Sequence, residues 1–200
     1  MPRCLKRVEN VRNYRLASKR ASTRRIADKP THFQTENMPA GNYIVVPQTS
    51  SENRYYIPIG FMPPESLCSN AVRIVPNATL YHFGVLTSSA HMAWMRVVTG
   101  RLKSSYQYAS NIVYNNFPWP EGADEAAISA TAQGILDARQ KYPDSSLADL
   151  YDPLTMPADL RAAHQANDKA VLAAYGLKSD TDERALVAHL FALYAGRVES

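Results

Sequence analysis

Glycine is scarce and widely spaced in this 200-residue sequence. Even the two closest of its eight glycines, Gly122 and Gly134, are twelve positions apart. The phosphate loops of nucleotide-binding proteins, and the loop that cradles S-adenosylmethionine, need two or more glycines within a few residues, so that backbone N–H groups can approach the ligand. The sequence therefore encodes none of these loops.

Cysteine is also scarce, and long apolar runs are absent. Cys4 and Cys68 are the two cysteines, which suggests neither a disulfide framework nor a zinc cage. No apolar run approaches the ~18 residues of a membrane span, and the basic N-terminus is not followed by an apolar signal segment. Since 46% of the residues are apolar, we expect a folded cytoplasmic protein in a reducing compartment.

Catalytic constellations are equally hard to find. The five histidines, at positions 32, 82, 91, 164 and 189, have no histidine or cysteine within metal-ligand spacing. There is no Gly-x-Ser-x-Gly elbow, and carboxylates are abundant only near the C-terminus, where solvated helix faces explain them. We expect no catalytic residue, no metal and no cofactor in this chain.

Charge is present but unevenly distributed. Residues 1–29 contain ten Lys and Arg against Glu9 and Asp28, a balance of +8, whereas residues 30–120 carry +2 and residues 121–200 carry −6. A strongly basic first part indicates a polyanionic partner, with nucleic acid the leading candidate. A solvated or frayed terminus explains the same run equally well, because blocks of like charge often form disordered tails.

Hydrophobic periodicity predicts a short β-rich region after a basic helical or partly ordered arm. Apolar residues at loose helical spacing occupy 5–27. Alternation and β-branched residues then predict strands at 43–47, 55–61, 72–76, 80–86 and 106–114. Pro76-Asn-Ala-Thr79 has the chemistry of a hairpin turn. The segment from Thr87 to Gly100 is apolar nearly all round and predicts a buried helix.

Beyond Phe117-Pro-Trp-Pro120, which we expect to join the sheet to the next region, alanine and acidic residues predominate. Helices are predicted near 123–140, 157–175 and 182–195, with Gly176 and Gly196 in stopping positions. The predicted fold class is α+β, a mixed or antiparallel sheet with a buried helix followed by a small C-terminal helical bundle. The predicted domains are an arm at 1–29, a recognition domain at 30–120 and a helical domain at 121–200.

Three segments carry a resemblance to a known family: Tyr43 to Phe61, Gly100-Arg-Leu-Lys-Ser-Ser-Tyr-Gln-Tyr108 and Val113-Tyr-Asn-Asn-Phe-Pro-Trp-Pro120. They resemble the target-recognition region of MmeI-like type IIL restriction-modification enzymes and their stand-alone methyltransferase relatives. Leu147 to Pro157 and Ala173-Ala-Tyr-Gly-Leu177 resemble the C-terminal helical segment of that family. The likeness extends over about residues 11–177.

In that family an S-adenosylmethionine-dependent adenine-N6 methyltransferase domain lies upstream, often preceded by an endonuclease. The resemblance therefore implies that this chain is the DNA-reading fragment of a larger enzyme. Its expected partners are double-stranded DNA and the upstream methyltransferase domain, where S-adenosylmethionine is expected to bind.

The resemblance also implies base-selecting residues after Gly-Arg-Leu, at Lys103 and Ser105, with the lysine favouring guanine. Residue chemistry extends the list of DNA contacts, since Arg and Lys read guanine while Asn and Gln read adenine. The further candidates are Arg101, Gln107 and Asn111 as readers, Arg54 with Ser50 and Ser51 on a phosphate, and Arg12 and Arg15 along the backbone. Pairing of Arg54 with Glu52 inside the fold is an equal alternative.

Two other classes of function stay open. The chain is alternatively a protein-interaction module that docks on a partner methyltransferase or another basic protein, or an enzyme whose site assembles from distant residues. RNA binding is a variant of the leading interpretation. Tyr106, Tyr108 and Tyr114 form an alternating stripe that is more typical of a core than of base stacking, and Met92, Trp94 and Met95 are assigned to the core.

Overall fold

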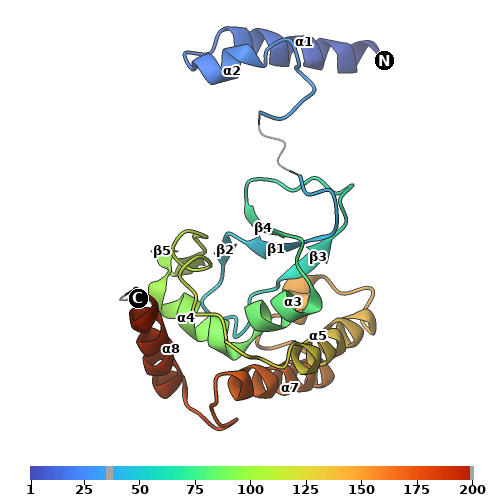
Figure 1. Ribbon diagram of the computed structural model, residues 1–200. Helices are drawn as coiled ribbons and strands as arrows, with labels where there is room; N and C mark the ends of the chain where they lie inside the picture. Colours follow the sequence, from blue (N-terminus) through green and yellow to red (C-terminus); the bar gives the residue numbers. More distant parts are fainter. Residues whose placement is uncertain (35–37, 199–200) are drawn as a thin grey trace. The chain divides into compact units, whose positions relative to one another are not determined.

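The computed structural model describes residues 1–34 and 38–198. It divides into two compact units, Met1–Met38 and Pro39–Ser200, called here the N-terminal unit and the main unit (Figure 1). The N-terminal unit contains helices α1, Pro2–Leu16, and α2, Ala21–Arg25. Most of the basic segment is thus helical, and Ala27 is its one buried residue among those the structure describes.

A three-stranded antiparallel sheet opens the main unit. Strand β1, Tyr43–Pro47, lies between β3, Gly60–Met62, and β4, Val72–Pro76. The strands predicted at 43–47 and 72–76 are confirmed. The strand predicted at 55–61 is wrong for most of its length, because β-structure begins only at Gly60.

A second antiparallel sheet has the order β2-β6-β5, with β2 at Thr49–Ser50, β5 at Gly100–Leu102 and β6 at Ser105–Gln107. Gln48 links the two sheets: its N–H donates to the Ala71 carbonyl at 2.8 Å, and its carbonyl accepts from the Tyr108 N–H at 2.7 Å. The strand predicted at 106–114 ends at Gln107, and hydrogen-bonded turns follow it.

The predicted strand at 80–86 and its hairpin are wrong, because Leu80–Thr87 forms helix α3. His82 Nδ1 accepts a hydrogen bond from the Thr79 N–H at 3.2 Å, which caps the helix start. Five consecutive residues of α3, from Phe83 to Thr87, are buried. A short segment that is apolar on all sides has no periodicity to separate strand from helix, so packing decided this element.

Helix α4, Ser89–Val98, confirms the predicted buried helix. Ser88 caps its start, since the Ser88 side chain accepts from the His91 N–H at 3.4 Å. Met92, Trp94 and Met95 are at most 2% exposed, so their assignment to the core is confirmed. The tyrosine stripe is also largely core, since Tyr106 and Tyr108 are 5% and 2% exposed.

Four helices follow: α5 at Glu125–Gln140, α6 at Leu147–Leu150, α7 at Ala158–Ala174 and α8 at Glu183–Val198. Asp124 caps α5 by accepting from the Ala127 N–H at 3.0 Å. Gly176 lies just past α7 with a φ of 70°, the left-handed conformation that ends helices. The predicted stop at Gly196 is wrong, because α8 continues to Val198.

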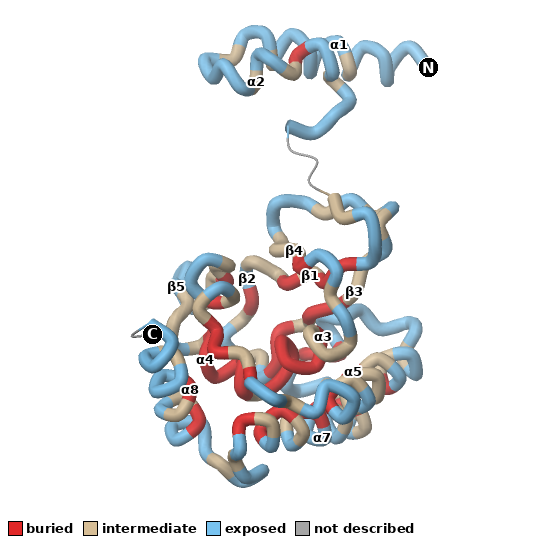
Figure 2. Tube along the Cα trace, viewed as in Figure 1, coloured by how far each residue is buried: buried red, intermediate tan, exposed pale blue. Residues whose placement is uncertain are grey.

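These helices share one hydrophobic core with the β-rich region (Figure 2). Helix α5 packs on both α3 and α7, and α8 packs on α4. Asn167 of α7 donates from Nδ2 to the Gly84 carbonyl at 2.8 Å, in a fully buried position. The Tyr175 hydroxyl donates to the Pro118 carbonyl at 2.8 Å and so ties α7 to the connecting segment. The predicted α+β fold class is confirmed.

Among the described helices, none combines the length and the apolar composition that crossing a membrane would require.

Candidate nucleic-acid interface

The hairpin of β5 and β6 displays Lys103 at its tip. Leu102 pairs with Ser105, so the loop consists of two residues. Lys103 has a φ of 55°, a left-handed conformation that favours glycine or asparagine in such turns. Holding a lysine there costs on the order of 1 kcal/mol, and backbone strain of this kind concentrates at functional sites. The strained loop therefore presents an exposed cation where glycine would be easier to accommodate.

Arg101 stabilises the hairpin through contacts with Glu52, Ser104 and Tyr106. Its Nη1 donates to Glu52 Oε2 and to the Ser104 carbonyl, both at 3.0 Å, while its guanidinium carbon lies 4.4 Å from the centroid of the Tyr106 ring. Both members of the ion pair are partly exposed, so the pair adds little stability. Its effect is geometric, because it fixes the tip against the loop that follows β2.

One face of the second sheet is polar and accessible. The alternation of side chains places Ser105 and Gln107 on the same face, with Thr49 beside Gln107 on the neighbouring strand. Gln107 Nε2 donates to Thr49 Oγ1 at 2.8 Å and to the Tyr106 carbonyl at 3.5 Å. The amide oxygen Oε1 of Gln107 has no hydrogen-bond partner among the described residues, so it can accept a hydrogen bond from a ligand.

Asn111 lies apart from this face. The strand predicted at 106–114 would place Asn111 on the face of Gln107, but β6 ends at Gln107 and residues 110–116 form turns. The Ile112 and Val113 N–H groups donate to the Ala109 carbonyl at 3.1 and 2.8 Å, which coils this segment. Asn111 is exposed on it.

Arg54 and Ser50 each have an unsatisfied buried polar atom. Arg54 Nε and Ser50 Oγ are buried without a hydrogen-bond partner among the residues described. The alternative in which Arg54 pairs with Glu52 is wrong, since Glu52 is paired with Arg101. Ser51 Oγ accepts from the Asn53 N–H at 3.3 Å and shapes the turn between them. Arg54 is half-buried, and its terminal guanidinium nitrogens make no hydrogen bond or ion pair with the described residues, so these nitrogens are suited to an external acceptor.

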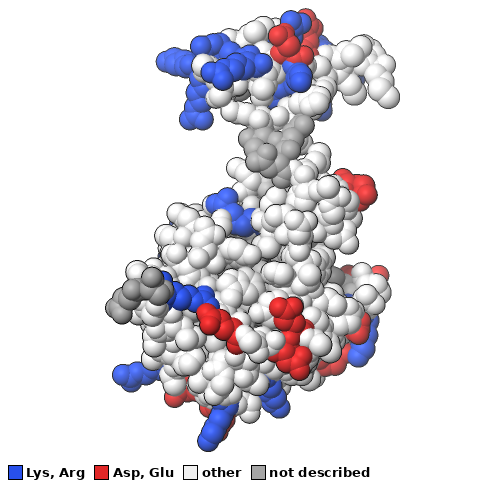
Figure 3. All heavy atoms as spheres, viewed as in Figure 1, with Lys and Arg blue, Asp and Glu red and all other residues white. Residues whose placement is uncertain are grey.

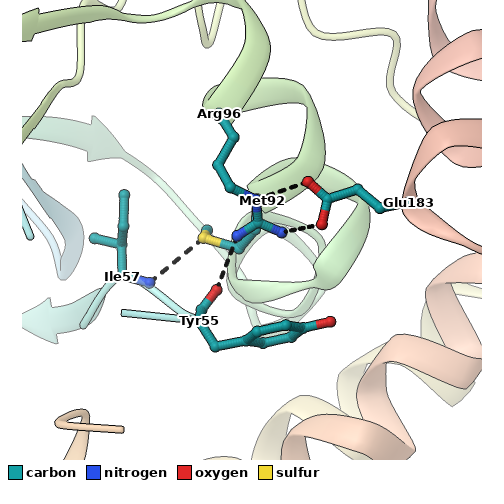
Figure 4. A network of polar contacts seen from close by, with 5 residues as sticks. All are labelled: Tyr55, Ile57, Met92, Arg96 and Glu183. Carbon is teal, nitrogen blue, oxygen red and sulfur yellow. Dashed lines mark hydrogen bonds and ion pairs between the residues drawn. The ribbon is translucent and has the colours of Figure 1, made fainter. Parts of the chain in front are cut away.

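The loop that carries Arg54 is anchored to α4 and α8 (Figure 4). Arg96 donates to the Tyr55 carbonyl at 3.2 Å, and its other nitrogens bond both carboxylate oxygens of Glu183 at 2.9 and 3.0 Å. The Ile57 N–H points to Met92 Sδ at 3.4 Å. Two-point contact between guanidinium and carboxylate fixes orientation as well as distance, so α4 and α8 together position this loop.

His91 supports the second sheet from the core. Its Nε2 lies 3.0 Å from the Tyr108 hydroxyl, and its ring packs edge-on against Phe117 with centroids 4.7 Å apart. Complete burial lowers the pKa of His91 to about 3, and burial raises the pKa of Tyr108. Both groups are therefore neutral at pH 7 and serve as structural hydrogen-bond partners.

Arg73 is a candidate that the sequence interpretation missed. It lies opposite Val46 in the β1–β4 register, so the two side chains share a face of the first sheet, and Val46 is fully buried. Arg73 Nε is buried with no partner in the part of the chain described. The available signal was a single cation within the apolar run Val72-Arg-Ile-Val-Pro76.

Arg12 and Arg15 have partners within the N-terminal unit. Arg12 Nη2 lies 3.0 Å from Asp28 Oδ1. Arg15 donates to the carbonyls of Ile26, Lys29 and His32 at 3.2, 2.6 and 2.6 Å. These bonds hold α1 against the segment after α2. Their predicted contact with DNA stays a prediction.

The described residues offer no metal centre, since no group of three or more His, Cys, Asp or Glu side chains comes together among them. The glycine spacing does not fit a loop for S-adenosylmethionine either. The chemistry available at the surface is that of Lys, Arg, Ser and Gln side chains, which are hydrogen-bond donors and acceptors suited to bases and phosphates.

Comparison with known proteins gives a consistent assignment. The family model of the MmeI target recognition domain matches residues 1–121, and that of the MmeI C-terminal domain matches residues 121–199. DNA methyltransferase A of Bacillus subtilis (strain 168) is 37% identical over 188 residues, which are 92% of this chain and 21% of that protein.

A solved structure of the type IIL restriction-modification enzyme MmeI in complex with DNA is 44% identical, with a TM-score of 0.92. The match covers 98% of this chain and 27% of that one, so the chain spans about a quarter of the solved relative. The resemblance found in the sequence is confirmed. The chain belongs to the MmeI family, to its target recognition and C-terminal domains.

Proposed function

We propose that this chain reads the sequence of double-stranded DNA for a larger restriction-modification methyltransferase. The observation that carries the proposal is Lys103, held in a left-handed conformation at an exposed hairpin tip. Support comes from the relatives, because the solved MmeI structure is a complex with DNA and the curated relative is a DNA methyltransferase.

In this proposal the hairpin enters the major groove. Lys103 Nζ donates to O6 or N7 of a guanine, the commonest specific contact of a basic side chain. Gln107 accepts through Oε1 from the exocyclic amine of adenine, since its Nε2 is already engaged by Thr49. Ser105, next to Gln107 on the same face, contacts a neighbouring base. Arg101 holds the tip in place.

Contacts to phosphates orient the chain without reading sequence. Arg54 fits this role because the terminal nitrogens of its half-buried guanidinium have no protein acceptor among the described residues. Ser51 and the exposed Asn111 add neutral donors, whereas Ser50 is only 3% exposed and its buried Oγ is out of reach of a phosphate. Arg73 is added to this group for the same reason as Arg54.

Methyl transfer belongs to another part of the parent protein in this proposal. That part would bind S-adenosylmethionine and methylate adenine at N6, and it would contact this chain as a partner. The proposal rests on the glycine spacing, which supplies no cofactor loop here, and on the fraction of each relative that the chain covers. The chain itself would perform no bond-making.

Selection from a pool of randomised duplexes tests the proposed function. The chain should enrich one sequence and bind it at least 1,000-fold more tightly than random duplex, the usual lower limit for specific recognition. The Lys103→Ala variant should lose preference at one base pair and keep the others. Enrichment of no sequence, or methylation of DNA by the chain alone, would refute the proposal.

A further inference from the structure

One side of helix α1 makes the contacts that hold the N-terminal unit together. Arg12 pairs with Asp28, and Arg15 donates to three carbonyls of the segment after α2. Val8, half-buried, lies about one turn before Arg12 and two turns before Arg15 on the same side. This side of α1 therefore faces the rest of the unit, and Arg12 and Arg15 hold the helix in that orientation.

The opposite side of α1 collects six polar or aromatic donors, which we call the outer face: Arg3, Lys6, Arg7, Asn10, Asn13 and Tyr14. At about 100° per residue they fall within an arc of about 120°. All six are exposed, and no side-chain hydrogen bond or ion pair involves them among the residues described. Glu9, the acidic residue of α1, lies outside this arc.

Figure 3 shows Lys and Arg side chains gathered on the N-terminal unit. On the outer face the cations stand at positions 3, 6 and 7, within about one helical turn, or ~6 Å of rise. Phosphates of one DNA strand succeed each other at about 3.4 Å of axial rise. Three such cations can therefore contact neighbouring phosphates of one backbone.

We propose that the outer face of α1 binds the phosphate backbone of duplex DNA independently of sequence. The inference rests on the proposed function and deepens it, because it assigns backbone contact to Arg3, Lys6 and Arg7. Arg12 and Arg15 become positioning residues that turn this face outward. Asn10, Asn13 and Tyr14 extend the surface with neutral donors, which commonly accompany basic residues on phosphates.

The test compares two triple variants of the full chain with equal net charge. Arg3→Gln, Lys6→Gln and Arg7→Gln remove the outer-face cations, and glutamine preserves helix propensity. The matched control combines Arg161→Gln, Lys169→Gln and Arg184→Gln, three exposed cations of α7 and α8. Each triple lowers the formal charge from +4 to +1. Circular dichroism verifies that both remain helical.

Affinity for the selected duplex and for a random duplex is measured by fluorescence anisotropy from 50 to 200 mM salt. Three lost phosphate contacts reduce the slope of log affinity against log salt by about 2.7. The parent's affinity then falls about 40-fold more than that of the outer-face variant over this range. Both duplexes should be affected alike, and the control should keep the parental slope.

An unchanged slope in the outer-face variant, or an equal reduction in the control, overturns the proposal. If the parent still prefers its selected duplex in that case, the proposed function stands while the role of α1 fails. A parent that binds neither duplex refutes both. Arg15→Ala adds a further arm: it should reduce the helicity of the N-terminal unit together with DNA affinity, as expected of a positioning residue.

Discussion

Replacing Gly84 with alanine should destabilise the main unit by about 2 kcal/mol. A Cβ at this position would lie 2.7 Å from Ile128 Cγ2, 2.9 Å from Asn167 Oδ1 and 3.1 Å from Ala132 Cβ. Overpacking of this kind costs about 1–3 kcal/mol, and disturbing the buried Asn167 hydrogen bond adds about 1 kcal/mol. The better helix propensity of alanine returns about 1 kcal/mol, which leaves the net value above.

Gly134 supplies the matched control, since it also lies inside a helix, α5, and has no atom within 4 Å of a built Cβ. Gly134→Ala should stabilise the chain by up to about 1 kcal/mol through helix propensity alone. Urea unfolding followed by tryptophan fluorescence, to which the buried Trp94 contributes, measures both changes. For a domain of this size, Gly84→Ala should lower Tm by about 4–8 °C. Shifts of the same sign in the two variants would refute the packing argument.

Three further outcomes are expected. Lys103→Ala should reduce discrimination at one base pair by about 1–3 kcal/mol in competition assays, and equal losses on selected and random duplexes would exclude it from base reading. Because the pKa of buried His91 falls from 6.5 to about 3, the unfolded chain binds the extra proton between these values and stability declines as pH falls. His91→Gln should flatten this dependence, by up to about 1.4 kcal/mol per pH unit, in urea titrations from pH 6 to 4. Tyr56→Phe removes the 2.6 Å hydrogen bond to Asp168 and should cost about 1.5–3 kcal/mol, whereas Tyr55→Phe, on an exposed ring, should leave the unfolding midpoint unchanged.

Local signals predicted those elements whose ends are set by their own residues. The helix that ends before Gly176 follows from capping chemistry, and Gly176 has the expected left-handed conformation. The strand prediction for residues 80–86 is wrong because the conformation of this segment depends on α5, which approaches Gly84 too closely for a side chain to fit. That contact joins positions more than forty residues apart, and no local pattern records it.

In the candidate interface, too, local sequence identified individual residues but not the contacts between distant segments. Lys103 and Ser105 could be singled out because they occupy a short recognisable segment, and the structure places them at one hairpin tip. The partner of Arg101 could not, because Glu52 is brought to it by the pairing of β2 with β6. Arg73 could not be singled out from the sequence, because its Nε is buried only through the pairing of β4 with β1, which places Arg73 opposite Val46.

The single core beneath the two family regions has a consequence for how such proteins diversify. The matched regions meet at residue 121, yet the Asn167 amide and the Arg96–Glu183 pair reach across that point. A gene fusion that exchanged only the segment before residue 121 would have to bring compatible partners for both contacts. Recognition regions in this lineage should therefore be inherited together with their own C-terminal helices, while substitutions at the hairpin tip remain free to vary.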